Sequence, residues 1–149
     1  MENLGADQHS GSPRVDAVYD SDLKSVDMAE AAVVELAQEM GFDEDDLHRI
    51  GIAMREAMVN AVVHGNKYSG VKKVRMKAWS GDESLKVIVT DEGSGFEVTR
   101  VPDPLAQENL LKESGRGILL MQAFVDEFQV RRLHPVGTEV TMIKYLAPR

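Results

Sequence analysis

Apolar side chains recur at helical spacing in two consecutive stretches of the first half of the chain. Within residues 21–42 they fall at Leu23, Val26, Ala29, Val33 and Leu36. Gly41 follows at the place where a helix C-cap is expected. Residues 43–67 open with acidic side chains, which favour a helix N-terminus, and keep the helical spacing to about His64. The pattern therefore predicts two successive helices, the second of which ends near Gly65.

The rest of the chain has the pattern of two hairpins separated by a loop and a helix. Residues 71–79 and 84–91 alternate apolar with polar side chains, and the turn SGDE lies between them. Residues 92–117 are rich in Gly, Pro and polar side chains, with one short helical pattern at 105–112. A loop of this length in a compact domain is usually a functional lid or disordered. A helix (ILLMQAFVDEF) is predicted directly after Gly117, followed by a second hairpin, EFQVRRL and TEVTMIKYL, around HPVG.

The predicted order of elements is α-α-β-β-loop-α-β-β. Because the strands come as hairpins, we expect an α+β fold in which helices cover one face of a mixed, mostly antiparallel sheet. Residues 1–14 are polar and contain Gly, Ser and Pro, so we expect a disordered leader there. Residues 15–149 are then expected to form one domain, long enough to bury a core without metals or disulfides.

Composition narrows the possible functions. The hydrophobic fraction of 43% and the charged fraction of 28% are those of an ordinary soluble globular protein. The absence of cysteine excludes a disulfide framework, a thiolate metal site and a cysteine nucleophile. The formal net charge of -8 argues against broad nucleic-acid binding, and the basic run KKVRMK is most simply a solvated strand face. With no signal peptide and no apolar run long enough to cross a bilayer, we expect a cytoplasmic protein that binds neither nucleic acid nor membrane.

The second helix carries the first candidate chemistry, in MREAMVNAVVHGNK. Glu56 and Asn60 lie one turn apart beside the apolar face, and Lys67 continues the same row. Such an oxygen-bearing pair suits a general base and a ligand for a hard cation. Taken alone, the pair is more simply a solvated helix edge, because E-x-x-x-N is common by chance.

Two glycine-rich segments carry the remaining candidates. In VIVTDEGSGFE, Asp91 ends a strand, and Gly93 and Gly95 allow a sharp turn and a close backbone approach to a ligand. The Asp91 carboxylate is suited to accept a hydrogen bond from an exocyclic amine. A strand-terminating turn is an equally good explanation of this segment by itself.

In ESGRGILLMQAF, Gly115 and Gly117 lead into a helix, whose N-terminal amides form a ready anion site. Ser114 adds a hydroxyl and Arg116 a positive charge. An ordinary helix start preceded by a flexible connection remains an alternative. Thr138, which follows Gly137, reads in isolation as part of a turn.

Several enzyme classes are excluded by their missing motifs. The sequence contains no Walker A motif, no eukaryotic protein kinase set and no G-x-S-x-G. The histidines are scattered without metal-ligand spacing, which argues against a zinc site.

The order and spacing of these segments together resemble the GHKL superfamily of ATPases and kinases. The shared features are an E-x-x-x-N-A helix, a hairpin, D-x-G-x-G, a variable loop, G-x-G before a helix, and a late G-T. Within the superfamily, AMREAMVNAVVHGNK is similar to the bacterial anti-sigma factor serine kinases. The resemblance covers about Val18 to Leu146 and implies a Bergerat fold, a two-layer α/β sandwich with a mobile ATP lid at about residues 94–115.

The resemblance also implies roles for individual residues. Glu56 would be the general base and Asn60 the ligand of Mg²⁺. Asp91 would read the adenine amino group beside Thr138, with Gly93 and Gly95 shaping that end of the pocket. Gly115 and Gly117 would present amides to the phosphates of ATP. Lys67 and Ser114 complete the predicted nucleotide-binding set, and Arg116 is a predicted catalytic residue.

One departure from the family pattern concerns the glycine-rich loop. The sporulation kinases carry a basic residue directly before the Ser-Gly of this loop, whereas this chain has Glu113 there and a cation at Arg116. Arg116 would substitute by reaching the γ-phosphate, or transfer would be inefficient.

The resemblance implies a homodimeric anti-sigma factor with protein serine kinase activity. It would sequester a sigma factor and phosphorylate an anti-anti-sigma protein of the STAS fold. The alternatives are a GHKL-fold ATP-binding regulator of another partner-switching pathway, with weak or no kinase activity, and a detached histidine kinase catalytic domain.

Overall fold

One antiparallel sheet forms the base of the molecule. The computed structural model describes residues 9, 11–93 and 115–146. The strands are β1 (Val15–Asp20), β2 (Lys73–Ser80), β3 (Ser84–Thr90), β4 (Glu127–Arg132) and β5 (Thr138–Tyr145). They pair in the order β1-β2-β3-β5-β4, and each neighbouring pair is antiparallel.

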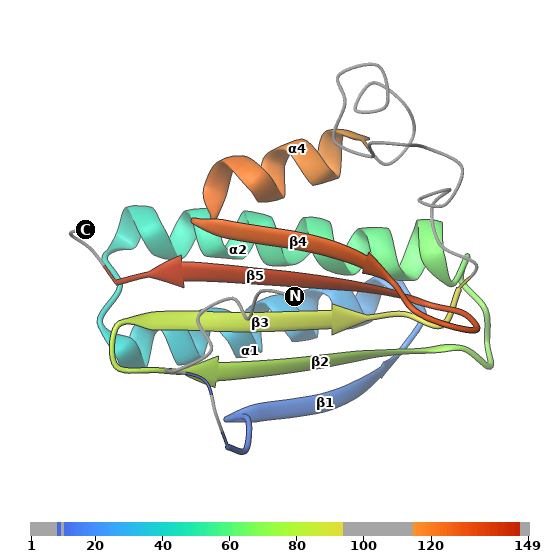
Figure 1. Cartoon of the computed structure of the whole chain (residues 1–149), viewed down its shortest axis with the longest axis horizontal. Helices are drawn as coiled ribbons and strands as arrows, with labels where there is room; N and C mark the ends of the chain where they lie inside the picture. The colour runs from blue at the N-terminus through green and yellow to red at the C-terminus, as the bar shows by residue number, and fades with distance from the viewer. Residues whose placement is uncertain (1–8, 10, 94–114, 147–149) are drawn as a thin grey trace.

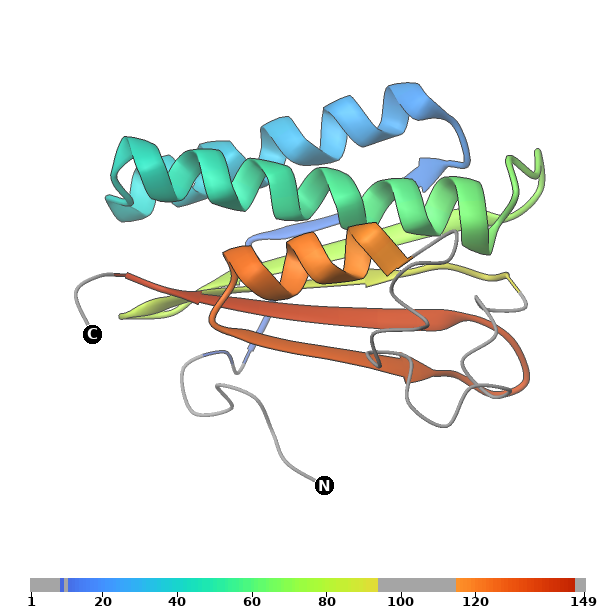
Figure 2. The same cartoon turned by 90° about the horizontal axis from the view of Figure 1, so that it is seen from above.

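The helices cover one face of this sheet. They are α1 (Leu23–Met40), α2 (Glu44–Val59), the π-helical η2 (Asn60–Gly65) that continues it, and α4 (Gly115–Phe124). Figures 1 and 2 show α1, α2 and α4 together on that face. The predicted α+β class and two-layer architecture are therefore confirmed. No helix in the described part of the chain has the length and apolar character needed to cross a membrane.

Local sequence signals account for the ends of the first two helices. The Asp22 side chain accepts a hydrogen bond from the Ser25 N–H, and the Asp43 side chain accepts one from the Asp46 N–H. Both aspartates satisfy amide donors that a helix N-terminus leaves unpaired. Gly41 ends α1 in the left-handed region, with φ of 97°, which glycine adopts without steric cost.

The core lies between the helices and the sheet. Alternate residues of β2 and β3 face the helices, and the methionines Met54, Met58, Met76 and Met121 are almost fully buried among them. Burying each such side chain stabilises the fold by about 1.5–3 kcal/mol. The same packing holds α2 and α4 above the centre of the sheet, which fixes where their polar side chains lie.

The first strand was not predicted. β1 is an edge strand in which Val15, Ala17 and Tyr19 face the helices, while the intervening side chains are exposed. Its alternation is weakened by the exposed Val18 and by its position in a polar N-terminal region. In the described parts of the chain the order of elements is therefore βααββαββ, and the prediction without β1 was wrong.

The basic side chains of β2 in the run KKVRMK lie on the face of the strand opposite the buried Val74 and Met76, as expected. The Arg75 guanidinium binds both carboxylate oxygens of Asp16 at 2.9 Å, and Lys73 pairs with Asp20. Both acidic partners belong to β1, so these ion pairs connect the edge strand to β2.

Two further boundaries differ from the prediction. The helix expected after Gly117 begins at Gly115 and ends at Phe124, because the chain turns at Val125 to start β4. The predicted lid and the short helical pattern at 105–112 lie outside the described residues. So does most of the predicted leader, although His9 contacts Ser84 and the Arg14 N–H donates to the Ala78 carbonyl at 2.8 Å.

Candidate active site

Glu56 and Asn60 lie where α2 passes into the π-helix. Glu56 is in the last turn of α2, and Asn60 begins η2. Asn60 is 3% exposed, and its Nδ2 has no hydrogen-bond partner among the residues that the structure describes. A buried amide donor without a partner is costly, and π-helical turns are common at functional sites. Both features distinguish this turn from an ordinary solvated helix edge.

The first turn of α4 faces these two side chains. A Cβ placed on Gly117 would lie 3.0 Å from Glu56 Oε1 and 3.1 Å from Asn60 Nδ2. The backbone of α4 therefore approaches both polar groups closely, at a helix end whose amides have no intrahelical partners. Figure 2 shows this end of α4 beside the final turns of α2 and η2. The sequence had predicted that the helix starts after Gly117. In the structure Gly117 lies inside α4.

Asp91 directly follows β3 and is 5% exposed. Its Oδ1 accepts hydrogen bonds from the Gly93 N–H at 2.9 Å and the Thr138 N–H at 3.2 Å. The Asp91 N–H in turn donates to the Thr138 carbonyl at 3.0 Å. Burial raises the pKa of the Asp91 carboxyl from 3.8 to about 6, against the opposing effect of the two backbone donors. The carboxyl is thus held rigidly and is poorly solvated.

Three glycines enclose Asp91. A Cβ on Gly65 would lie 2.3 Å from Asp91 Oδ2, and one on Gly93 would lie 1.8 Å from the Gly65 carbonyl oxygen. Gly137, with φ of 111°, would place a Cβ 2.6 Å from the Asp91 carbonyl oxygen. Such distances are not tolerated in folded proteins, so the end of η2, the end of β3 and the start of β5 meet only because these residues lack side chains.

Replacement of Gly93 by alanine is expected to destabilise the protein by about 2 kcal/mol or more, because the new methyl group must displace the Gly65 backbone. Gly70→Ala is the matched control. Nothing lies within 4 Å of a Cβ there, and we expect a change of no more than about 0.5 kcal/mol. Urea unfolding of both variants measures the difference. Equal stability of the two would contradict the close contact between Gly93 and Gly65.

The structure describes only some of the remaining predicted site residues. Thr138 is buried next to Asp91, and its Oγ1 has no hydrogen-bond partner within the described part of the chain. Lys67 is exposed just beyond η2, with a positive φ of 51°. Gly115 begins α4, but Gly95, Ser114 and the side chain of Arg116 lie outside the described residues. The structure thus brings Glu56, Asn60 and Gly117 into one group, and Asp91, Gly93 and Thr138 into another.

Sequence reasoning missed three residues that build the Asp91 end. Gly65 and Asn66 were interpreted only as a helix stop, and Gly137 only as part of a turn. The G-T pair at 137–138, one of the features shared with the superfamily, could have identified Gly137 as part of the site. No local signal identified Gly65, because its contact is with Asp91, which lies just beyond the end of β3 and far away in the sequence.

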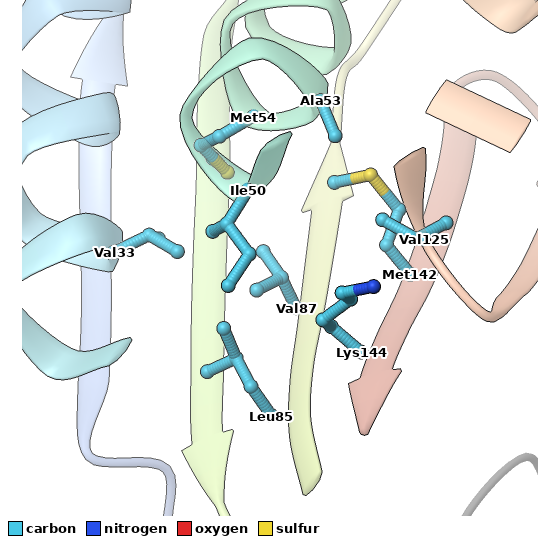
Figure 3. A pocket seen from close by; sticks show the side chains of 9 residues that line it. All are labelled: Val33, Ile50, Ala53, Met54, Leu85, Val87, Val125, Met142 and Lys144. Carbon is cyan, nitrogen blue, oxygen red and sulfur yellow. The ribbon is translucent and has the colours of Figure 1, made fainter. Parts of the chain in front are cut away.

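A small apolar cavity lies elsewhere in the core. It encloses ≈ 250 Å³ between atoms, part of it open to solvent, and Figure 3 shows the side chains that line it. Its lining residues come from α1, the middle of α2, β3, β5 and Val125, whereas Asn60 and Asp91 directly follow the C-terminal ends of α2 and β3. The lining is apolar except for Lys144, which pairs with Asp46 at 3.5 Å. This cavity is therefore separate from the candidate site.

Comparison with known proteins identifies the family. Residues 19–144 match the family described as Histidine kinase-like ATPase domain. The serine-protein kinase RsbW of Bacillus subtilis is 32% identical over 117 residues, which cover 74% of this chain and 72% of the relative. The anti-sigma F factor of Thermoanaerobacter pseudethanolicus is 30% identical over 120 residues, which cover 79% and 83%.

A solved structure agrees with this assignment at the level of the fold. The crystal structure of the RsbU and RsbW domains of a Mycobacterium tuberculosis protein aligns with a TM-score of 0.60 at 21% identity. The alignment covers 89% of this chain and 31% of the other, so this chain corresponds to about a third of that protein. The predicted resemblance and fold are confirmed: the chain belongs to the histidine kinase-like ATPase domain family.

Proposed function

We propose that this protein is an anti-sigma factor and an ATP-dependent protein serine kinase. It would act in the cytoplasm, bind a sigma factor and phosphorylate a serine of a STAS-type anti-anti-sigma protein. Relatives at 30–32% identity are named for these two activities. The observation that carries the proposal is the close approach of Gly117 to both Glu56 and Asn60, which combines a carboxylate, a carboxamide and a helix N-terminus.

The Asp91 end is proposed to bind adenine. Its rigid, poorly solvated carboxyl is suited to accept a hydrogen bond from the exocyclic amine. Thr138 lies beside it, and no described residue bonds the Thr138 Oγ1. The Gly117 end is proposed to bind the phosphates through backbone amides. Lys67, Gly95, Ser114 and Gly115 are proposed to extend these two ends of one ATP pocket.

Asn60 is proposed to hold Mg²⁺. Its buried side chain fits this role, because its Nδ2 has no hydrogen-bond partner among the described residues, so no bond to that nitrogen prevents the carboxamide from turning its oxygen toward a hard cation. Mg²⁺ accepts few protein ligands when phosphates and water complete its shell. When bound, the ion supplies charge neutralisation at the phosphates.

Glu56 is proposed to take the proton from the substrate serine hydroxyl. The serine oxygen forms a bond to the γ-phosphorus, the bond to the bridging oxygen breaks, and ADP leaves. Phosphoryl transfer depends mainly on positioning and on charge stabilisation, so one base and a set of oriented amides form a sufficient site. Arg116 is proposed to contribute charge at the γ-phosphate, in the loop where Glu113 replaces the basic residue of the family pattern.

A homodimer is proposed to form along β1 and α1. β1 is an edge strand, and no other described strand pairs with its outer side. Three large apolar side chains are exposed on these elements: Val18 at 63%, Leu23 at 53% and Met28 at 53%. Exposed apolar side chains beside a free strand edge favour association.

Incubation with γ-labelled ATP and Mg²⁺, with and without the STAS proteins encoded in the same genome, tests the function. We expect label on a serine of one STAS protein. ATP binding without transfer would instead support the alternative function, an ATP-binding regulator with weak or no kinase activity. Glu113 in place of a basic residue is the reason to consider that alternative. Label on histidine would support a histidine kinase catalytic domain, and absence of nucleotide binding would contradict the whole proposal.

A further inference from the structure

Asn66 is a buried polar residue that the roles above leave unused. It directly follows η2 and is 2% exposed. Its backbone N–H donates to the Ala61 carbonyl at 2.8 Å, and its carbonyl accepts from the Ser69 N–H at 3.0 Å. Burial of a carboxamide is costly unless its own donors and acceptor are satisfied. The partners of this side chain therefore show what it does.

The Asn66 side chain joins three separate parts of the fold. Its Nδ2 donates to Ser21 Oγ at 2.9 Å, in the turn between β1 and α1. The same nitrogen donates to the Lys73 carbonyl at 3.0 Å, at the start of β2. Its Oδ1 accepts from the Glu92 N–H at 2.8 Å, one residue beyond Asp91.

The bond to Glu92 is the one that reaches the candidate site. Glu92 lies between Asp91, whose Oδ2 is against Gly65, and Gly93, whose Cα is against the Gly65 carbonyl. Asn66 is the next residue after Gly65. Residues 91–93 are therefore attached to residues 65–66 by one hydrogen bond and two contacts that require glycine.

We propose that Asn66 is a positioning residue for the adenine end of the pocket. By holding the Glu92 N–H it sets the register between the end of η2 and the end of β3, and so the direction of the Asp91 carboxyl. This inference rests on the proposed role of Asp91 in binding adenine. Because Asn66 acts on the Asp91 end, it controls ATP affinity rather than the rate of transfer at saturating ATP.

Three variants separate positioning from general stability. Asn66→Ala removes all three side-chain hydrogen bonds. Ser21→Ala removes the bond to Asn66, together with the bond from Ser21 Oγ to the Lys72 carbonyl, but leaves the Glu92 contact in place. Asn66→Asp keeps an oxygen that accepts from the Glu92 N–H and loses both Nδ2 donors.

Calorimetric titration with ATP and Mg²⁺, thermal unfolding and steady-state kinetics distinguish these variants. All three are expected to lower Tm. The Kd for ATP is expected to rise about tenfold or more in Asn66→Ala, and to stay within about threefold of wild type in Ser21→Ala and Asn66→Asp. The kcat at saturating ATP should change by less than about threefold in each variant.

Affinity that simply follows Tm across the three variants, or an unchanged Kd in Asn66→Ala, would overturn the inference. If Asn66→Ala does not fold, Asn66→Asp is the test. A near wild-type Kd for ATP despite its lowered Tm supports the inference, and a Kd that rises together with the loss of Tm contradicts it. Hydrogen exchange of the Glu92 amide without nucleotide gives a second readout, expected to be faster in Asn66→Ala and unchanged in Ser21→Ala. If wild-type protein binds no ATP, the proposed function fails, and this exchange measurement still decides whether Asn66 holds Glu92.

Discussion

Glu56→Gln is expected to lower the rate of serine phosphorylation by about 100-fold or more while leaving the Kd for ATP within a few-fold of wild type. Glutamine keeps the size of the side chain that packs against Gly117, so the first turn of α4 keeps its place. An amide, however, cannot accept the proton of the serine hydroxyl. Single-turnover transfer to the STAS substrate and equilibrium binding of ATP measure the two effects separately.

The control for this variant is Glu35→Gln on α1. It makes the same chemical change at an exposed position away from α4 and is expected to leave both transfer and binding unchanged. Wild-type transfer by Glu56→Gln would refute the assignment of the base. A large loss of ATP binding in Glu56→Gln would indicate that the carboxylate acts in binding rather than in proton transfer.

Asp91→Asn is expected to abolish the preference for ATP over GTP. An ionised carboxylate accepts from the amine at C6 of adenine, whereas guanine presents a carbonyl oxygen there, so the wild-type protein should reject GTP strongly. The two nucleotides share their phosphates, and GTP therefore serves as the matched control ligand. Competition binding is expected to show that the variant binds both nucleotides weakly and about equally. Retained selectivity would contradict the role of Asp91.

The same carboxyl predicts a pH dependence. Because burial raises the pKa of Asp91 to about 6, wild-type ATP affinity should be greatest above that pH and fall by up to about tenfold per pH unit below it. In the ligand-free protein the effect on stability has the opposite direction. A raised folded-state pKa means that the contribution of Asp91 to stability is complete below about pH 4 and is lost as pH rises through 6.

The size of this stability effect follows from the two pKa values, 3.8 and about 6, which correspond to about 3 kcal/mol. Asp91→Asn does not titrate, so the difference in unfolding free energy between variant and wild type should move by about that amount in favour of the variant between pH 4 and pH 8. Urea unfolding at the two pH values measures it. A difference that does not change with pH would show that Asp91 is solvated in the folded protein.

Local patterns predicted most of the fold because the elements that carry it are regular. β2 and β3 alternate apolar and polar side chains along their length, and Asp22, Gly41 and Asp43 mark helix ends by local hydrogen bonding. β1 was missed because the exposed Val18 weakens its alternation and because the strand it pairs with, β2, lies more than fifty positions later. Helix boundaries near Gly115 also depend on packing against α2 rather than on local sequence.

The candidate site was predictable only in part, because several of its contacts join segments that are far apart in the sequence. Glu56 and Asn60 were identified by spacing, and their significance came from the glycine segments downstream. The contact of Gly65 with Asp91 and the three partners of Asn66 join distant segments, and a single sequence carries no local sign of them. The π-helical turn at Asn60 likewise has no simple periodicity that predicts it.

Titration of ¹⁵N-labelled protein with ATP and Mg²⁺, followed by amide resonances, tests most directly whether the two groups of residues form one nucleotide pocket. We expect the amides of Gly65, Gly93, Gly117 and Thr138 to shift along a single binding curve, with those of Leu85 and Met142 at the apolar cavity unchanged. Shifts confined to one of the two groups, or shifts centred on the apolar cavity, would contradict a single ATP site built from both.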